Sequence, residues 1–344
     1  MAGLRVWNRV NELAIEHKCD AVLFCGDLTH ESVLDAPTAD VLMRAVTSWG
    51  ERRRKFGIPL LLNPGNHSAY DPKAGIFVEA ALGGVNDLVR VLGRSLLEMG
   101  KVALYNVPFC DDPADAIASI KLRKDRFNLL SIHQGISGCS HAGWKCDDKT
   151  GLSPKHFRRF DLTVAGHFHP HQTFAGGFYV GSPFQMDFRD GGEKRGAVLL
   201  IIDAERKTWK KQLIGLNEPK FITVFATIKP KSGVVFDEDT PSLEQLKGQY
   251  VRVQYEGSQT SFQSHRNALD AEIEKIASVA LGVTRLPKIR RQRVQRIKGL
   301  DVGMSTQNMF AKYVESDKSD VADLDRSRLV AIANRALEQG GFRD

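Results

Sequence analysis

The stretch Ala165-Gly166-His167-Phe168-His169 follows the run Asp161-Leu162-Thr163-Val164. Two histidines in alternation after a short β-branched run place two imidazoles at the tip of a strand. In α/β sheets, the carboxyl ends of strands are where ligands usually bind. Imidazole is a suitable ligand for Zn, Mn or Fe, but a lone His-x-His is equally compatible with two surface histidines.

Three further strand ends carry the same kind of residue. Gly26-Asp27, Gly65-Asn66-His67 and His133 each follow an apolar run. Singly, Asp27 fits a turn or helix cap, Asn66 a turn residue and His133 a hydrogen-bonded core histidine. Together, at four strand ends, they indicate a metal site.

Composition limits the class of protein. The 344 residues include 42% hydrophobic and 26% charged residues, as in an ordinary globular protein of about two domains. We find neither a signal-peptide pattern nor an apolar run of about 20 residues, so we expect no membrane span. Five cysteines, an odd number, favour free thiols and a cytoplasmic location. Cys139, His141 and Cys146 could suggest zinc, but no fourth ligand follows at a suitable spacing.

The first part of the chain alternates helical and strand patterns. An amphipathic helix is expected for residues 1–18, a second helix for 39–56, and another helical stretch between His67 and Val102. Strands are expected in these segments: 20–25, 58–62, 102–107, 128–132, 161–164, 178–180 and 197–202. This order predicts a layered α/β domain with a buried sheet over residues 1–215.

The pattern changes after residue 216. Segments 221–228 and 250–255 read as strands and 262–279 as a helix, which predicts a small α+β module over residues 216–300. Net charge is +7 and the pI is about 9.1, which favours an acidic partner such as nucleic acid. Basic residues crowd into one segment and fit either a solvated face or phosphate contact; they are Lys288, Arg290, Arg291, Arg293, Arg296 and Lys298.

Residues 301–344 are predicted to be a linker followed by an amphipathic helix. Leu324, Leu329, Ile332 and Leu337 share one helical face. Such a helix could dock on its own domain or on a partner.

The residue types at the strand ends suit phosphoester chemistry. The carboxylate of Asp27 could bridge two divalent ions, one activating water and one clamping a phosphoryl oxygen. Asn66 adds an oxygen ligand without charge, and His67 points differently and could protonate the leaving oxygen. Imidazoles of His133 and His167, with His169, complete a mixed N/O set that favours Mn²⁺, Fe or Zn²⁺ over Mg²⁺ or Ca²⁺.

This set of motifs resembles the calcineurin-like metallophosphoesterases, and within them the Mre11/SbcD nuclease branch. The likeness to that branch rests on Gly26-Asp27-Leu28-Thr29-His30-Glu31 and on Gly166-His167-Phe168-His169-Pro170 followed by Tyr179-Val180-Gly181-Ser182-Pro183. The α+β module falls where these nucleases carry a DNA-capping domain. Residues 324–337 are similar to the end of the bacteriophage recombination endonuclease subunits.

The resemblance implies a role for each matching residue. Asp27 would be the metal bridge, and Asn66, His133 and His167 would bind one ion. A second ion would be held by His169. His67 would be the catalytic histidine, and His30 would lie near the scissile strand and influence exonuclease action.

The resemblance also implies partners and a fold. The fold would be a layered β-sandwich flanked by helices, with an α+β capping domain and a helical tail. Mn²⁺ would be the cofactor, with Mg²⁺, Fe or Zn²⁺ possible, and DNA the substrate. The basic segment itself supplies the candidate DNA contacts, which are Lys288, Arg290, Arg291 and Arg293. An SMC-like ATPase of the SbcC/Rad50 type would dock on residues 321–339, from Val321 to Gln339, and the chain could form a homodimer.

One departure from the family stands out. The family opens with a strand carrying Asp-x-His, which supplies two ligands to the ion that His169 binds. No Asp-x-His precedes Asp27. Either the start codon was assigned late or the protein is a degenerate scaffold, and the otherwise intact set favours the first. A DNA nuclease subunit is therefore the leading hypothesis; a non-catalytic DNA-binding scaffold and a nucleotide or protein phosphoesterase are the alternatives.

Overall fold

The computed structural model describes residues 2–53, 56–71, 73–74, 76–83, 89–141, 143–190 and 194–290, and short pieces at 304–305, 308–312, 330–332 and 335. Two compact units are present. One comprises Met1–Ala226, Phe236–Tyr255 and Asn267–Leu286; the other comprises the described residues of Thr227–Val235, Glu256–Arg266 and Pro287–Asp344.

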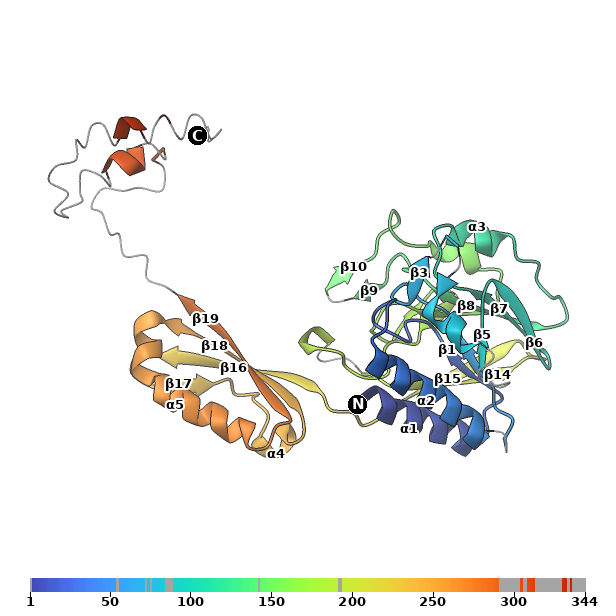
Figure 1. Cartoon of the computed structure of the whole chain (residues 1–344), viewed down its shortest axis with the longest axis horizontal. Coiled ribbons are helices and arrows are strands. Elements are labelled where there is room, and N and C mark those ends of the chain that lie inside the picture. The colour runs from blue at the N-terminus through green and yellow to red at the C-terminus, as the bar shows by residue number, and fades with distance from the viewer. Residues whose placement is uncertain are drawn as a thin grey trace. The chain divides into compact units, whose positions relative to one another are not determined.

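Two N-terminal helices lie against each other (Figure 1). They are α1 (Ala2–Glu16) and α2 (Ala36–Arg53), and both confirm the predicted helices. Trp7 and Trp49 meet edge to face, with ring centroids 5.5 Å apart. The Trp7 indole N–H donates to the carbonyl of Ala45 at 3.1 Å. This hydrogen bond orients the two helices in addition to the burial of the rings.

A three-stranded parallel sheet carries the first two site motifs. Its order is β1 (Val22–Phe24), β2 (Leu60–Leu62) and β5 (Val89–Val91). Because β1 and β2 run parallel, Gly26-Asp27 and Gly65-Asn66-His67 leave the sheet at the same edge.

A six-stranded sheet carries the other two motifs. Its order is β12 (Gln172–Phe174), β13 (Gly177–Tyr179), β11 (Leu162–Gly166), β8 (Phe127–His133), β7 (Val102–Val107) and β6 (Ser95–Met99). In the parallel pair of β8 and β11, His133 lies opposite Gly166. His133 and the His-x-His therefore emerge side by side.

The two sheets share a core. One buried cluster contains Cys25 and Leu61 from the smaller sheet with Leu104, Leu129 and Leu162 from the larger one. The antiparallel pair β14 (Ala197–Asp203) and β15 (Thr208–Ile214) packs partly buried side chains against the same cluster. The second face of the larger sheet is covered by α3 (Pro113–Ala118) and the short helix η2 (Pro154–Phe157). This mixed α/β architecture confirms the predicted fold class.

The helical stretch expected between His67 and Val102 was wrong. In its place the described residues form β3 (Ala69–Asp71), β4 (Ile76–Phe77), the 3-10 helix η1 (Val78–Leu82), β5 and β6. Pro72, Gly75, Gly83 and Gly84 interrupt the sequence at short intervals. Proline removes a helical hydrogen bond and glycine costs backbone entropy, so a continuous helix is disfavoured there.

Beyond residue 216 the chain forms a small sheet with one long helix (Figure 1). The strand order is β17 (Gly233–Phe236), β16 (Phe221–Lys229), β18 (Tyr250–Ser258) and β19 (Gly282–Arg290). The helices are α4 (Leu243–Leu246) and α5 (Gln259–Ala277), which kinks at His265. The sequence predicted β16, β18 and α5 but missed β17 and β19.

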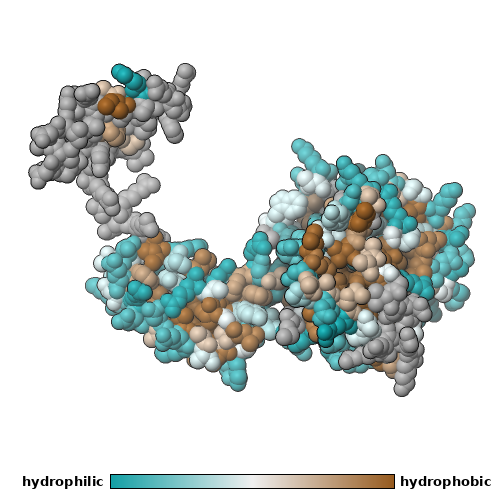
Figure 2. Space-filling model, in the orientation of Figure 1, coloured by the Kyte–Doolittle hydropathy of each residue, from teal (hydrophilic) through white to brown (hydrophobic). Residues whose placement is uncertain are grey.

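No helix within the described ranges is long and apolar enough to cross a membrane. Figure 2 shows polar and apolar residues interspersed on the face that it draws. Most of the predicted C-terminal helix, of the docking segment 321–339 and of the tail 301–344 lies outside the described residues.

Candidate metal centre

Three glycines allow the strand ends to meet. A Cβ on Gly166 would lie 1.8 Å from the carbonyl oxygen of Cys25, and one on Gly26 would lie 1.8 Å from Nδ1 of His133. A Cβ on Gly65 would lie 2.2 Å from Oδ1 of Asp27. A side chain at any of these positions would displace a neighbouring residue, so these three motifs carry glycine directly before their polar residue.

Four donor side chains converge at this junction. Ligand atoms of Asp27, His133 and His167 all lie within 4.8 Å of one another. Oδ1 of Asn66 lies 3.0 Å from Nε2 of His133 and 2.9 Å from Nδ1 of His167. One carboxylate, one amide oxygen and two imidazoles thus surround one point, and we name these four residues the metal group.

The hydrogen bonds of His133 show that the metal group fits a cation. Its Nδ1 donates to the carbonyl of Cys25 at 2.7 Å, which leaves Nε2 with a lone pair in the neutral ring. That Nε2 lies 3.1 Å from Oδ2 of Asp27 as well as 3.0 Å from the Asn66 oxygen. A cation among these three electron-rich atoms would remove their mutual repulsion, and the Nδ1–H bond is the kind that orients a ligating imidazole.

The pKa values of Asp27 and His167 favour the protonation states that bind a cation. Burial raises the pKa of Asp27, but the hydrogen bond and charge of His133 in its protonated form, together with the His67 N–H, outweigh burial, so the pKa lies below its ordinary value. Burial, and then the charge that His133 carries when protonated, lowers the pKa of His167 to about 4. At neutral pH Asp27 is therefore ionised and His167 neutral, the forms that bind metals.

His67 lies beside the metal group but is oriented differently. Its backbone N–H donates to Oδ1 of Asp27 at 2.9 Å, and its Nδ1 donates to the carbonyl of His30 at 2.9 Å. The His30 and His67 rings stack with centroids 5.0 Å apart. Both side chains are exposed, and Nε2 of His67 is left for a ligand.

Comparisons with known proteins bear on this site. Residues 4–171 match the family model described as Calcineurin-like phosphoesterase. Residues 4–171 are therefore similar to a calcineurin-like phosphoesterase domain. Members of this family hydrolyse phosphoesters with divalent metals, in agreement with the metal group.

Solved structures and curated proteins were compared as well. The crystal structure of TT1561 of Thermus thermophilus is 14% identical, with a TM-score of 0.38, covering 62% of this chain and 94% of its own. Another solved structure is 12% identical, with a TM-score of 0.37, covering 60% of this chain and 92% of its own. No curated protein matches the chain.

A buried glutamate supports the Asn66 loop of the phosphoesterase domain. Glu79 is 1% exposed and its Oε1 accepts a hydrogen bond of 2.7 Å from Ser68. Ser68 in turn contacts the backbone of Gly65, at the start of the motif. Burial raises the pKa of Glu79 despite the Ser68 hydrogen bond. The sequence analysis missed Glu79 because no local pattern shows which carboxylate will be buried.

His169 has different neighbours from the metal group. Its Nδ1 lies 3.3 Å from Oδ1 of Asp190, in the short helix η3 (Phe188–Asp190). Asp190 also accepts from Arg195 at 3.1 Å, and both side chains are 6% exposed. The His141 ring lies 4.4 Å from the His169 ring. The structure therefore groups His169 with Asp190, Arg195 and His141, here named the Asp190 cluster. The sequence analysis weighed His141 only for a zinc site and did not single out Asp190 or Arg195.

The predicted DNA-contacting residues fall at the end of β19. Lys288 is exposed on this strand and Arg290 ends it. Arg291 and Arg293 lie outside the described residues.

Proposed function

We propose that this chain is a Mn²⁺-dependent DNA nuclease subunit that hydrolyses phosphodiesters. The observation that carries the proposal is the metal group of Asp27, Asn66, His133 and His167 with His67 held beside it. The set combines nitrogen and oxygen donors, which suits Mn²⁺ better than Mg²⁺.

The side chains divide the chemistry between them. A divalent cation held by the metal group would supply Lewis-acid polarisation of a phosphoryl oxygen. Asn66 contributes an oxygen without charge, so it does not repel the anionic substrate. His67 is fixed by its hydrogen bond to the His30 carbonyl and by its stacking on His30, and its Nε2 can exchange a proton with the leaving oxygen.

A second ion bound by His169 is part of the same proposal. The imidazole now shares a hydrogen bond with Asp190, so binding an ion through Nδ1 would require that bond to be given up. The metal group supplies ligands for one ion. A protein that binds no second ion would fit the alternative of a non-catalytic DNA-binding scaffold. Cleavage assays separate the two.

DNA as the substrate is supported by charge. The chain carries a net charge of +7, and a basic surface releases counterions from the phosphate backbone on binding. Lys288 is exposed at the start of the basic segment 288–298. A phosphoesterase acting on nucleotides or phosphoproteins would not need such a segment.

Cleavage of end-labelled linear duplex DNA with Mn²⁺ tests the proposal. Wild-type protein should cleave it, EDTA should abolish cleavage, and His67→Ala should lower kcat by about 10²–10⁴-fold. His17→Ala, at an exposed histidine just after α1, is the matched control and should cleave like wild type. Faster turnover of bis-p-nitrophenyl phosphate than of DNA would favour a small-substrate phosphoesterase. Salt-sensitive DNA binding without metal-dependent cleavage would favour the scaffold.

We also propose that residues 321–339 dock an SMC-like ATPase. Deleting them should abolish co-purification with that ATPase while leaving Mn²⁺ binding unchanged. Co-purification that survives the deletion would reject the docking proposal without affecting the nuclease proposal.

A further inference from the structure

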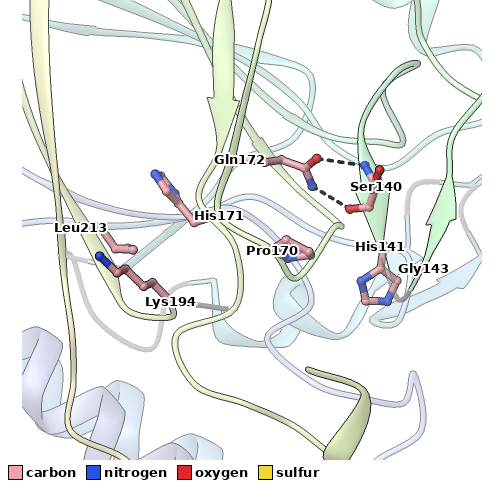
Figure 3. A pocket seen from close by; sticks show the side chains of 8 residues that line it. All are labelled: Ser140, His141, Gly143, Pro170, His171, Gln172, Lys194 and Leu213. Atoms are coloured by element: carbon pink, nitrogen blue, oxygen red, sulfur yellow. Dashed lines mark hydrogen bonds between the residues drawn. The ribbon is translucent and has the colours of Figure 1, made fainter. Parts of the chain in front are cut away.

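A pocket opens beside Pro170, at the end of the His-x-His loop (Figure 3). Its volume is about 390 Å³. It is lined by Ser140, His141, Gly143, Pro170, His171, Gln172, Lys194 and Leu213. Pro170 directly follows His169, so the pocket begins where the His-x-His loop ends.

One wall of the pocket is a β-hairpin held by side-chain hydrogen bonds. The hairpin pairs β9 (Ser140–His141) with β10 (Trp144–Lys145). Figure 3 shows the Gln172 amide bonded twice to the backbone of Ser140: Ser140 N–H donates to Oε1 at 2.9 Å, and Nε2 donates to the carbonyl at 2.7 Å. This pair of hydrogen bonds joins the hairpin to β12, so the wall is in place before a ligand arrives.

The opposite wall is basic. Lys194 is exposed at the rim. His171 donates from Nδ1 to the carbonyl of Val180 at 3.1 Å, so its Nε2 accepts from Lys211, whose Nζ lies 2.7 Å away. None of the described residues that line the pocket is acidic. The lining therefore favours an anion.

Size and position define the kind of anion. Pro170, Gly143 and Leu213 give an apolar surface beside the basic groups, as a sugar ring next to a phosphate requires. The volume lies at the lower end of the range for small-molecule pockets and is larger than a single phosphate needs. The pocket begins at Pro170, three residues after His167 of the metal group, so it offers a place for the next unit of a polynucleotide bound at the metal group.

We propose that the pocket binds the nucleotide adjoining the scissile phosphodiester, with its phosphate paired to Lys194. The proposal rests on the proposed function, because it identifies the pocket as a subsite for the same substrate. Lys194 would be a substrate-binding residue that contributes charge to binding and takes no part in bond cleavage.

Calorimetric titration with thymidine 3′,5′-bisphosphate tests the proposal without catalysis. EDTA is present, so that metal ions do not hold the phosphates. Wild-type protein should bind, and Lys194→Gln should weaken Kd by about five-fold, the effect of one exposed ion pair. The matched control is Lys124→Gln, which removes an exposed lysine just before β8, at the end of that strand remote from His133, and should bind like wild type.

Each outcome decides one of the two proposals. Equal Kd values for wild type and Lys194→Gln, or no binding by wild type, would overturn the subsite. Weaker binding by Lys194→Gln in a protein that cleaves no DNA would keep the anion subsite and reject the nuclease. In an active enzyme, kcat/KM for an oligonucleotide relative to bis-p-nitrophenyl phosphate should fall in Lys194→Gln.

Discussion

The metal group and the Asp190 cluster use the same residue types with different results. Each has a buried or half-buried carboxylate next to imidazoles. In the metal group, the lone pair of His133 faces both the negative charge of Asp27 and the amide oxygen of Asn66. In the Asp190 cluster, Arg195 supplies the positive charge from within the chain.

This difference shows which of the two carboxylates is available to bind a metal ion. Asp190 is satisfied by Arg195, His169 and the Met186 N–H, so the protein itself balances its charge. Within the described part of the chain, Asp27 is paired with His133 and the backbone N–H of His67 and forms no ion pair with a lysine or arginine, so an external cation would complete its balance. Residue type alone would not separate the two; the presence of an arginine does.

The largest effect is expected where the strand ends cross. Gly166→Ala should destabilise the fold by about 4 kcal/mol or prevent folding, because the new Cβ would overlap the backbone oxygen of Cys25. Gly215→Ala is the control, since a Cβ there meets nothing within 4 Å. Urea unfolding measures both, and equal stabilities would contradict the packing argument.

The second-largest effect is expected from a substitution that breaks the Asp190 cluster. Asp190→Asn should cost about 3 kcal/mol at neutral pH, since it leaves Arg195 buried without its partner charge. Burial raises the pKa of Asp190, but the His169 and Met186 hydrogen bonds and the Arg195 charge outweigh burial and lower it to about 2. The carboxylate therefore stabilises the fold fully above about pH 4, its unfolded pKa, and this is lost as pH falls through about 2.

Urea unfolding of wild type and Asp190→Asn between pH 2 and 7 measures this dependence. The difference between the two proteins should shrink below pH 4. A difference independent of pH would mean that charge is not the cause.

Histidines from the two regions should differ in metal affinity. His167→Ala should weaken Mn²⁺ binding by about a hundred-fold or more, and His169→Ala by less, because only His167 belongs to the metal group. Calorimetry with Mn²⁺ and each purified variant makes the comparison. A larger loss in His169→Ala would place the main ion at the Asp190 cluster instead.

The smallest effect concerns the second buried carboxylate, Glu79. The pKa of Glu79 is raised above its ordinary value, whereas the pKa of Asp190 is lowered. The protonated form stabilises the fold below the unfolded pKa of about 4.3, and that stabilisation is lost as pH rises through the folded pKa. Glu79→Gln keeps an oxygen for the Ser68 hydrogen bond and removes the titration.

The unfolding free energy of Glu79→Gln should therefore rise relative to wild type between pH 4 and 7. Parallel pH profiles for the two proteins would show that Glu79 does not titrate on unfolding.

Much of the site could be predicted from the sequence. Short apolar runs ending in Gly-Asp, Gly-Asn-His, His and Gly-His-x-His marked strand ends, and the structure places these ends together. The helix expected between His67 and Val102 did not form, because Pro72 and several glycines interrupt that segment. Strands β17 and β19 were missed, and β19 contains Pro287, which is unusual within a strand.

By itself, the sequence determined which residues end the strands and which atoms they offer, because alternation and glycine placement are local properties. Only the tertiary structure decided which of those atoms face one another. The His133 tautomer depends on the Cys25 carbonyl, more than a hundred residues away. The partners of His169, the support by Glu79 and the pocket at Lys194 likewise arise from segments that meet only on folding. The local sequence pattern determines where a strand ends. Burial and long-range packing determine the protonation states of the side chains and which of them are in contact.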